Sequence, residues 1–322
     1  MFYIGGEQEL APLNYFQEVT NSGRSSLRLI IESANLRNKH ILLPDFLCQV
    51  IIDILQEYQV TFDFYSVERN LDFQLPDNIE KYDAVYLIKY FGGSTDAFAK
   101  TCTSFHGCLI VDDVFSPYPE ILKRDQLWFS FNSLRKISHV ADFSLLYSNA
   151  PLASVIKTAL SGFSVMKYRA KNLKHEYLNF QQGSEKKYLD KFGQAEAILS
   201  SNFGIYSPSA DSIIAAIQYF NRLEQERNIR QRNYQQINDL LADYSIPIKS
   251  KFYSFAPLLL NNRDVVRQKL MEFNVFLAVH WPVCNLVDNV LSQSIISIPV
   301  DSRYSSTDIK KVCSLIIKLE GK

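Results

Sequence analysis

A lysine follows a stretch that reads as a buried strand, in the segment FSFNSLRKISH of residues 129–139. An ammonium group is costly to place in such a setting unless it has a partner or a task. A neutral lysine amine can form an imine with an aldehyde and can carry a proton during catalysis. We therefore expect Lys136 to be the amine that holds an aldehyde cofactor.

Two other segments carry groups that suit the same cofactor. The apolar run LIVDDVFSPY ends in Asp112 and Asp113, where sheet proteins place ligand contacts, and the segment NSGRSSL of residues 21–27 puts a glycine before an expected helix start, which suits a phosphate. Taken singly, the acids read equally well as turn residues, and the serines as a helix cap. With Lys136 they supply the three contacts that pyridoxal phosphate needs: an amine, an acid for the ring nitrogen and a phosphate site.

The elements that must position these residues alternate between helix and strand. Helical spacing predicts helices at 25–36, with Ser22 as N-cap, and at 47–58, while short β-rich runs predict strands at 40–44, 60–67, 82–91, 107–115, 127–131 and 143–148. This alternation indicates an α/β fold with a mostly parallel central sheet covered by helices on both faces. Ligands of such sheets lie beyond the carboxyl ends of the strands.

The second half of the chain predicts a different organisation. Residues 151–208 mix basic, aromatic and polar side chains, which is consistent with a helical excursion over the site or a contact with a partner. A long amphipathic helix is expected at 209–244, with Ser209 as its cap, followed by an alternation of strand and helix to the C-terminus. We expect a large cofactor-binding domain at 1–208, and a linking helix with a small α+β domain at 209–322.

Composition argues for a globular protein with a pocket. The chain has 322 residues, of which 47% are hydrophobic, and its 34 acidic and 34 basic residues balance. Without a charge excess, neither nucleic acid nor an anionic membrane is the expected partner. The start MFYIGGEQEL does not read as a secretory signal, and the most apolar stretch is interrupted by Pro44 and two aspartates, so we expect a cytoplasmic protein.

The cysteines favour neither a disulfide framework nor a metal site. Five cysteines form no CxxC pair, and an odd number suits reduced thiols. Cys102, His106 and Cys108 gather in the segment CTSFHGC, but their spacing is unlike that of zinc sites and no second cluster completes the ligand set. We therefore expect no metal.

In these motifs and their order the chain resembles the DegT/DnrJ/StrS group of pyridoxal-phosphate enzymes, sugar-nucleotide aminotransferases of the aspartate aminotransferase fold (fold type I). The resemblance covers nearly the whole chain and rests on the segments SGRSSL, LLPDFLC, YFGG, VDDVFS, SFNSLRK and IPVDSRYSSTDIKKV. It departs from the family where ADFSLLYS replaces a glycine pair after the lysine, and where Arg24 replaces a small hydroxyl residue.

The resemblance implies roles for individual residues. It makes Lys136 the Schiff-base lysine and Asp113 the partner of the pyridine nitrogen. Arg24, Ser25 and Ser130 would contact the phosphate.

Around the ring the resemblance is less specific. Ser116 stands where the family often has a glutamine that contacts the ring oxygen, and Cys48 falls near the usual stacking position, which leaves Phe46 and Phe91 as stacking candidates. His280 and Trp281, in the segment VHWP, resemble a segment near the substrate entrance, although a core position fits them equally well.

As an activity, the resemblance implies transfer of an amino group from glutamate or glutamine to a nucleotide-linked keto-sugar, for the biosynthesis of amino sugars in surface polysaccharide. It also implies a homodimer. Two alternatives remain open: a degenerate, non-catalytic protein that binds pyridoxal phosphate or a sugar nucleotide, and a pyridoxal-phosphate-dependent sugar dehydratase. The dehydratases carry histidine in place of the lysine, so Lys136 counts against the second.

Overall fold

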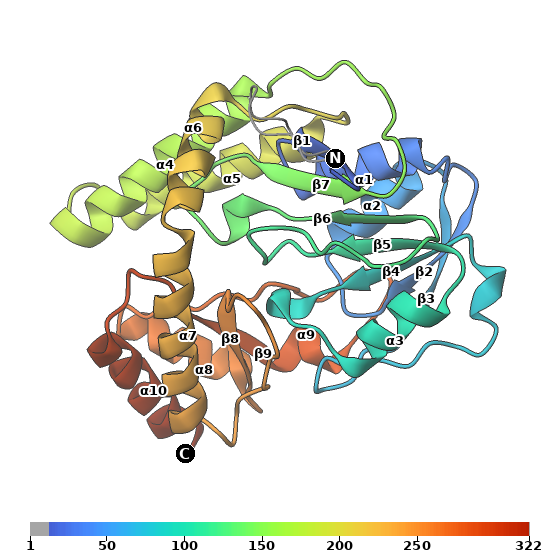
Figure 1. Cartoon of the computed structure of the whole chain (residues 1–322). Coiled ribbons are helices and arrows are strands. Elements are labelled where there is room, and N and C mark those ends of the chain that lie inside the picture. Colours follow the sequence, from blue (N-terminus) through green and yellow to red (C-terminus); the bar gives the residue numbers. More distant parts are fainter. Residues whose placement is uncertain (1–12, 322) are drawn as a thin grey trace, which may run out of the picture.

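A seven-stranded sheet forms the centre of the computed structural model, which describes residues 13–321 (Figure 1). The strand order across the sheet is β1-β7-β6-β5-β4-β2-β3. The strands are β1 (Phe16–Thr20), β2 (His40–Pro44), β3 (Thr61–Tyr65), β4 (Ala84–Ile88), β5 (Cys108–Asp112), β6 (Trp128–Phe131) and β7 (Ser144–Ser148).

The five neighbouring strands β3, β2, β4, β5 and β6 are parallel to one another. The remaining two strands, β7 and β1, are added to this ladder by antiparallel pairing. β2 pairs in parallel with β3 and β4, and the parallel ladder continues through β5 to β6. β7 is antiparallel both to β6 and to β1. The predicted mostly parallel sheet is confirmed, and the carboxyl ends of four of its strands lead directly into the segments that carry the candidate residues.

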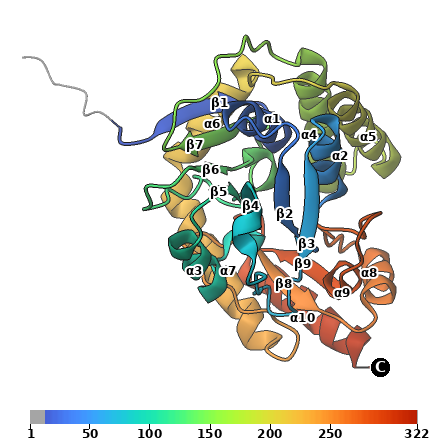
Figure 2. The ribbon, with the colours of Figure 1, turned by 90° about the vertical axis from the view of Figure 1, so that its right-hand side faces the viewer.

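Helices cover both faces of this sheet. Figure 2 shows α1 (Gly23–Ser33) and α2 (Gln49–Glu57) on one face and α3 (Asp96–Ser104) on the other. Ser22 caps α1 by accepting a hydrogen bond from the Ser25 backbone, as the sequence predicts. Both faces of the inner strands are therefore buried, which explains why β4 and β5 read as continuous apolar runs.

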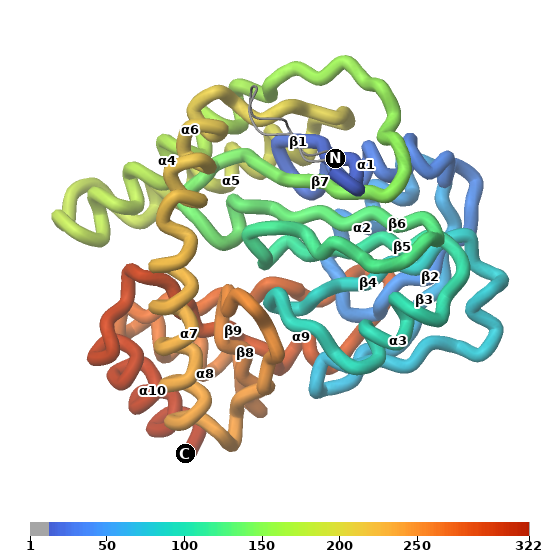
Figure 3. The backbone as a smooth tube through the Cα atoms, viewed as in Figure 1, coloured from blue at the N-terminus to red at the C-terminus, as the bar shows by residue number. Residues whose placement is uncertain are grey.

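The predicted long helix is in fact two helices. α6 (Ala210–Asn221) and α7 (Leu223–Leu240) meet at Arg222, whose φ of −108° and ψ of 8° leave the helical region. Ser209 caps α6 as expected. Figure 3 shows how the pair runs from the sheet down to the C-terminal part of the molecule.

The C-terminal part is a small α+β unit with its own core. It holds the antiparallel strands β8 (Phe255–Leu259) and β9 (Ile295–Pro299), with α8 (Arg263–Glu272), α9 (Val290–Ser294) and α10 (Ser306–Glu320). Within residues 275–282 the chain forms a single bridge, between Ala278 and Ser297. The domain boundary at residue 208 stays a prediction.

This unit contacts the carboxyl edge of the large sheet through polar bonds to backbone. The Ser254 hydroxyl donates to the Phe91 carbonyl at 3.0 Å, and Arg230 of α7 donates to the Ile137 carbonyl at 2.8 Å. The second of these bonds reaches the loop that carries Lys136. The position of that loop therefore depends on both parts of the chain.

Residues 151–208 form the helical excursion that the sequence suggests. α4 (Ser161–Phe180) and α5 (Glu185–Ser201) pack on each other as a hairpin that projects away from the sheet (Figures 1 and 2). Its own core is small and consists of Phe163, Ala195 and Leu199. The Ser207 amide donates to the Thr158 carbonyl at 3.1 Å, so the chain enters and leaves the hairpin side by side.

Two further observations concern membrane-spanning helices and metal ligands. Each helix within residues 13–321 is too short or too polar to traverse a lipid bilayer. In the same residues no three histidine, cysteine, aspartate or glutamate side chains gather as metal ligands would.

Candidate active site

The candidate residues gather where the parallel strands end. β2, β4, β5 and β6 finish at one edge of the sheet, because parallel strands share a direction. Cys48 at the start of α2, Lys89, Asp113 and Lys136 follow these four strands. The predicted location of the site, beyond the strand ends, therefore matches the fold.

Lys136 closes a short 3₁₀ turn, Leu134–Lys136, in the loop after β6. Its backbone amide donates to the Ser133 carbonyl at 3.0 Å. Burial, and next the charge of Arg135, lower the pKa of its amine. Among residues 13–321 the amine finds no hydrogen-bond or salt-bridge partner, so it is both easier to deprotonate than an ordinary lysine and uncommitted.

The charge of Lys136 affects the pKa values of three other side chains, Cys48, Asp112 and His280. Burial raises the pKa of the Cys48 thiol, and Lys136 is the leading charge that opposes this rise. Burial also raises the pKa of Asp112 to about 6, with Lys136 again opposing. The pKa of His280 falls to about 3 through burial and through Lys136. Lys136 therefore influences the pKa of all three groups.

The two neighbouring aspartates point to opposite sides, as successive residues of a strand do. The Tyr86 hydroxyl donates to Asp112 at 2.8 Å. Asp113 instead accepts from Lys89 at 3.1 Å and from the Ser116 hydroxyl, and burial and Lys89 are the leading influences on its pKa. The contacts thus turn the two carboxylates to different partners, and the predicted role of Asp113 toward the pyridine nitrogen stays a prediction.

Asp113 belongs to a buried ion cluster of its own. The Lys89 side chain is only 7% exposed, and its amine donates to Glu120 at 2.7 Å as well as to Asp113. Ser116, predicted to face the cofactor ring, uses its hydroxyl within this cluster. The cluster explains why a lysine can lie at the end of β4, since a buried cation needs paired carboxylates.

At the start of α1, the serines are largely occupied by the protein itself. The Asn21 side chain accepts from the hydroxyls of Ser22 and Ser25, each at 2.8 Å. The Tyr206 amide donates to the Ser25 hydroxyl at 3.1 Å. The Ser25 amide is occupied as well, since it donates to the Ser22 hydroxyl at 3.3 Å, and Arg24 extends to Ser200 at 3.0 Å and toward Glu196 at 3.5 Å.

Several buried polar atoms near the lysine lack partners. The hydroxyls of Ser130 and Ser133, which lie on β6 and just before the 3₁₀ turn, form no hydrogen bond within the described chain. The same holds for Nε2 of His280. Buried polar atoms are almost always satisfied in folded proteins, so these three unpartnered atoms are available to a polar ligand.

The predicted aromatic residues form one buried cluster beneath this region. The ring of Phe46 lies 5.1 Å from Tyr90 and 5.3 Å from Trp281, and Phe91 lies 5.0 Å from Trp281. Phe46 and Phe91 are completely buried, and Trp281 is nearly so. Their packing is that of a core, and their predicted roles toward the ring and the substrate stay predictions.

His280 lies at the edge of this cluster, its ring 4.3 Å from Phe255 and 4.9 Å from Phe115. Because its pKa falls to about 3, the imidazole is neutral at physiological pH. A neutral ring with a free Nε2 can either donate or accept one hydrogen bond, depending on its tautomer.

Sequence reasoning missed three charged residues near the lysine. Arg135 donates to Glu196 at 2.9 Å, and Lys167 donates to the same carboxylate oxygen at 2.7 Å. Arg135 had a visible signal, since it adjoins Lys136. The other two lie in the segment whose composition gave no periodicity to interpret.

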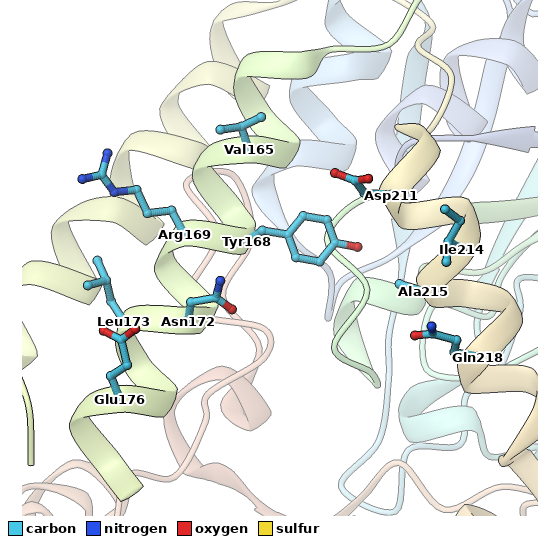
Figure 4. Close-up of a pocket in the computed structure, with 10 residues that line it drawn as sticks. All are labelled: Val165, Tyr168, Arg169, Asn172, Leu173, Glu176, Asp211, Ile214, Ala215 and Gln218. Atoms are coloured by element: carbon cyan, nitrogen blue, oxygen red, sulfur yellow. The ribbon is translucent and has the colours of Figure 1, made fainter. Parts of the chain in front are cut away.

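A wide hollow lies elsewhere, between α4 and α6. It has a volume of about 700 Å³, and Figure 4 shows the ring of Tyr168 on α4 pointing toward α6, which carries Asp211 and Gln218. None of the predicted cofactor contacts lines it. We therefore do not assign the chemistry to this hollow.

Solved structures with the same fold are aminotransferases. A DegT/DnrJ/EryC1/StrS aminotransferase of Brucella abortus superposes with a TM-score of 0.64 over 95% of this chain and 86% of that chain, at 14% identity. Helicobacter pylori PseC, an aminotransferase in the biosynthesis of pseudoaminic acid, gives the same TM-score, identity and coverage. The PMP-form of the sugar aminotransferase Spr1654 of Streptococcus pneumoniae gives 0.64 at 12% identity, over 95% of this chain and 88% of that chain.

The chain therefore has the fold of the DegT/DnrJ/EryC1/StrS aminotransferases, and the expected fold type I is confirmed. No family model and no curated protein matches the sequence. At such low identity the likeness shows the fold alone. What the site does has to be argued from its own residues.

Proposed function

We propose that the protein is a pyridoxal-phosphate-dependent aminotransferase that passes the amino group of glutamate or glutamine to a nucleotide-linked keto-sugar. One observation carries the proposal: an unpaired lysine amine of lowered pKa lies beyond the strand ends of a sheet with this fold. Among the solved structures that share the fold are an aminotransferase of pseudoaminic acid biosynthesis and a protein described as a sugar aminotransferase, which supports the same activity.

The residues present fit the cofactor. The unpartnered hydroxyls of Ser130 and Ser133 and the first backbone amides of α1 would hold its phosphate. Lys136 would bind its aldehyde carbon, and a carboxylate across the ring would hold the ring nitrogen. For that carboxylate we propose Asp112, with Asp113 as the competing candidate, because Asp113 is already paired with Lys89 and Ser116 while Tyr86 fixes the orientation of Asp112.

The chemistry divides between the cofactor and the chain. When bound, pyridoxal phosphate withdraws the electrons of a bond to the donor's α-carbon, which makes that carbon's proton acidic. Lys136 takes this proton and returns it at the next step, a task that a neutral amine performs and an ammonium group does not. Burial and Arg135 both favour the neutral amine. The buried wall of Phe91 and Trp281 keeps bulk water from one side of the site.

Reduction of a cofactor complex tests the proposal directly. The protein is mixed with pyridoxal phosphate, treated with borohydride and digested, and the peptides are searched for a phosphopyridoxyl group by mass spectrometry. We expect the group on Lys136 and its loss in Lys136→Ala, while Lys249→Ala, at a lysine 86% exposed, serves as the matched control. Attachment at other lysines only, or none, would refute the enzyme proposal.

A second pair of variants separates the two aspartates. Asp112→Asn and Asp113→Asn remove the same charge on opposite sides of the strand. We expect Asp112→Asn to lower turnover by at least ~100-fold with retained cofactor labelling, since a lost charge interaction at the reacting system is worth several kcal/mol. Asp113→Asn should mainly reduce stability, because it leaves Lys89 with Glu120 alone. The reverse outcome would assign the ring nitrogen to Asp113.

The substrate is identified by a panel of keto-sugar nucleotides with glutamate or glutamine as donor. Formation of an amino sugar supports the aminotransferase. Labelling of Lys136 without turnover on any member would favour the non-catalytic alternative. Loss of a sugar hydroxyl without amination would favour the dehydratase.

We also propose a cytoplasmic homodimer. Ile213, Ile214 and Ile217 of α6 are 44–57% exposed, an apolar surface of the kind that subunits bury. All five cysteines are free thiols, which suits a reducing compartment. Light scattering of the protein and of Ile214→Glu tests the assembly: we expect two chains in the first and one in the second.

A further inference from the structure

Four charged side chains from four separate segments meet beside the start of α1. Glu196 of α5 accepts from Arg135 at 2.9 Å and from Lys167 at 2.7 Å, and its other oxygen lies 3.5 Å from Arg24. The carboxylate is thus surrounded by three cations, which hold its pKa at about 2. The cluster carries two positive charges in excess of its negative one.

This excess charge is poorly solvated. The side chains of Arg24, Arg135 and Lys167 are 16%, 12% and 10% exposed. The Nε–H groups of both arginines are buried and have no acceptor within the described chain. A buried donor without a partner costs about 1–3 kcal/mol, so the cluster in its present state lacks an anionic acceptor.

The missing acceptor has the character of a phosphate. Arginine forks match phosphate oxygens in pairs, and the adjoining amides of α1 point outward at its start. A phosphate dianion offsets the three cations better than the single carboxylate of Glu196: it leaves one positive charge in excess, whereas Glu196 leaves two. Glu196 itself is 37% exposed and belongs to the projecting hairpin, so it can leave without disturbing the sheet.

The hairpin has few other fastenings to the body. Lys171 of α4 donates to the carbonyls of Ser138 and Val140, each at 3.1 Å, and the hydroxyls of Tyr168 and Ser212 lie 3.0 Å apart. The apolar cluster within the hairpin is small and centres on Phe163, Ala195 and Leu199. The contacts of Glu196 with Arg24 and Arg135, together with the bond from Arg24 to the Ser200 hydroxyl at 3.0 Å, are thus a main attachment of α5.

We propose that Arg24, Arg135 and Lys167 form a phosphate-binding site, and that Glu196 is an internal competitor that fills this site until a phosphorylated ligand displaces it. Displacement frees the middle of α5 and loosens the hairpin. The inference rests on the proposed function only for the source of the phosphate, which is either the cofactor or a nucleotide substrate.

Glu196→Gln tests the competition, with Glu176→Gln as a control that removes the same charge from an exposed site on the same hairpin. Titration calorimetry measures binding of inorganic phosphate, pyridoxal phosphate and uridine diphosphate. If Glu196 fills the site in about nine of ten molecules, only one molecule in ten is free to bind, and the apparent affinity for phosphate falls about tenfold. Glu196→Gln should therefore bind phosphate about tenfold more tightly than the unaltered chain. Equal affinity in both proteins would overturn the inference.

Two further measurements guard against a merely structural effect. Phosphate should raise the melting temperature of Glu196→Gln more than that of the unaltered chain, and Lys167→Met should weaken phosphate binding in both backgrounds. In the unaltered chain, phosphate at constant ionic strength should speed tryptic cleavage after Lys186 and Lys187, which begin α5. Unchanged or slower cleavage would contradict displacement of Glu196, and this assay does not depend on any variant folding.

The ligand series separates the sources of the phosphate. If Glu196→Gln tightens binding of pyridoxal phosphate but not of uridine diphosphate, the site serves the cofactor; the opposite result assigns it to a nucleotide. Tighter phosphate binding without labelling of Lys136 by borohydride would leave this inference standing and refute the proposed enzyme. Labelling of Lys136, with the same phosphate affinity in Glu196→Gln as in the unaltered chain, would support the proposed enzyme and refute this inference.

Discussion

Arg230 joins the two parts of the molecule, and its removal is a sharp test of how the Lys136 loop is held. Its side chain is 3% exposed and donates to the carbonyls of Ile137 at 2.8 Å and Ser254 at 3.1 Å. It also pairs with Glu226 at 3.0 Å and lies over the ring of Phe252, 4.8 Å from its centroid. We predict that Arg230→Met strongly destabilises the fold.

The magnitude follows from the groups left behind. Two buried carbonyls lose their donor at about 1–3 kcal/mol each, and a buried carboxylate loses its partner. Breaking a buried ion pair on one side costs about 3–5 kcal/mol, and methionine recovers part of the packing, so we expect a loss of about 3–5 kcal/mol in the free energy of unfolding. Urea denaturation followed by tryptophan fluorescence measures it.

Arg227→Met on the same helix is the matched control. Its side chain is 40% exposed and pairs with Glu224, itself 73% exposed. Exposed pairs contribute about 0–1 kcal/mol, so the expected loss is below ~1 kcal/mol. If Arg230→Met costs no more than Arg227→Met, the bonds from α7 to the lysine loop do not hold the two parts together, and the reasoning fails.

Three further predictions concern stability. Burial lowers the pKa of Lys171 to about 7, while in the unfolded chain it stays near 10.5. Because the unfolded chain binds more protons between these two pH values, the free energy of unfolding should rise with pH across that window. Denaturation series from pH 6 to 10 measure this rise, and Lys171→Met should flatten it. Gly92→Ala should lower the free energy of unfolding by about 1–3 kcal/mol, because Gly92 has a φ of +77° and an added Cβ lies 3.1 Å from the Ser116 hydroxyl. Gly193→Ala, inside α5 with open space around the added Cβ, should raise it by up to ~1 kcal/mol. Equal shifts of the melting temperature in the two variants would contradict this. Trp281→Ala should cost about 3–5 kcal/mol by urea denaturation, because the ring fills the aromatic cluster; a loss under ~1 kcal/mol would mark Trp281 as a binding residue rather than a core residue.

Local patterns in the sequence predicted most elements of the sheet and its helices. α1 and α2 have apolar faces at helical spacing, and the inner strands are short apolar runs. β1 escaped prediction because FQEVT is a half-polar edge strand without alternation. The break at Arg222 also escaped, since no proline or glycine marks it and the apolar pattern continues through it.

The site could be predicted only in part. Lys136 and the two aspartates were visible because they lie at or shortly after the carboxyl ends of strands, and strand ends of a parallel sheet meet at one edge. Which aspartate faces the lysine depends on the side of the strand, and one residue of register reverses the answer. Glu196 was out of reach, because its partners Arg24 and Arg135 lie 172 and 61 residues away and nothing local links them.

The side-by-side arrangement of Thr158 and Ser207 has a consequence for how such chains can diverge. A segment whose two ends adjoin can grow, shrink or be exchanged without moving its neighbours, since closing a loop of any length costs little more than closing a short one. The stretch between these residues is thus the place where relatives of this chain can change size and acquire new specificities, while the seven strands stay as they are.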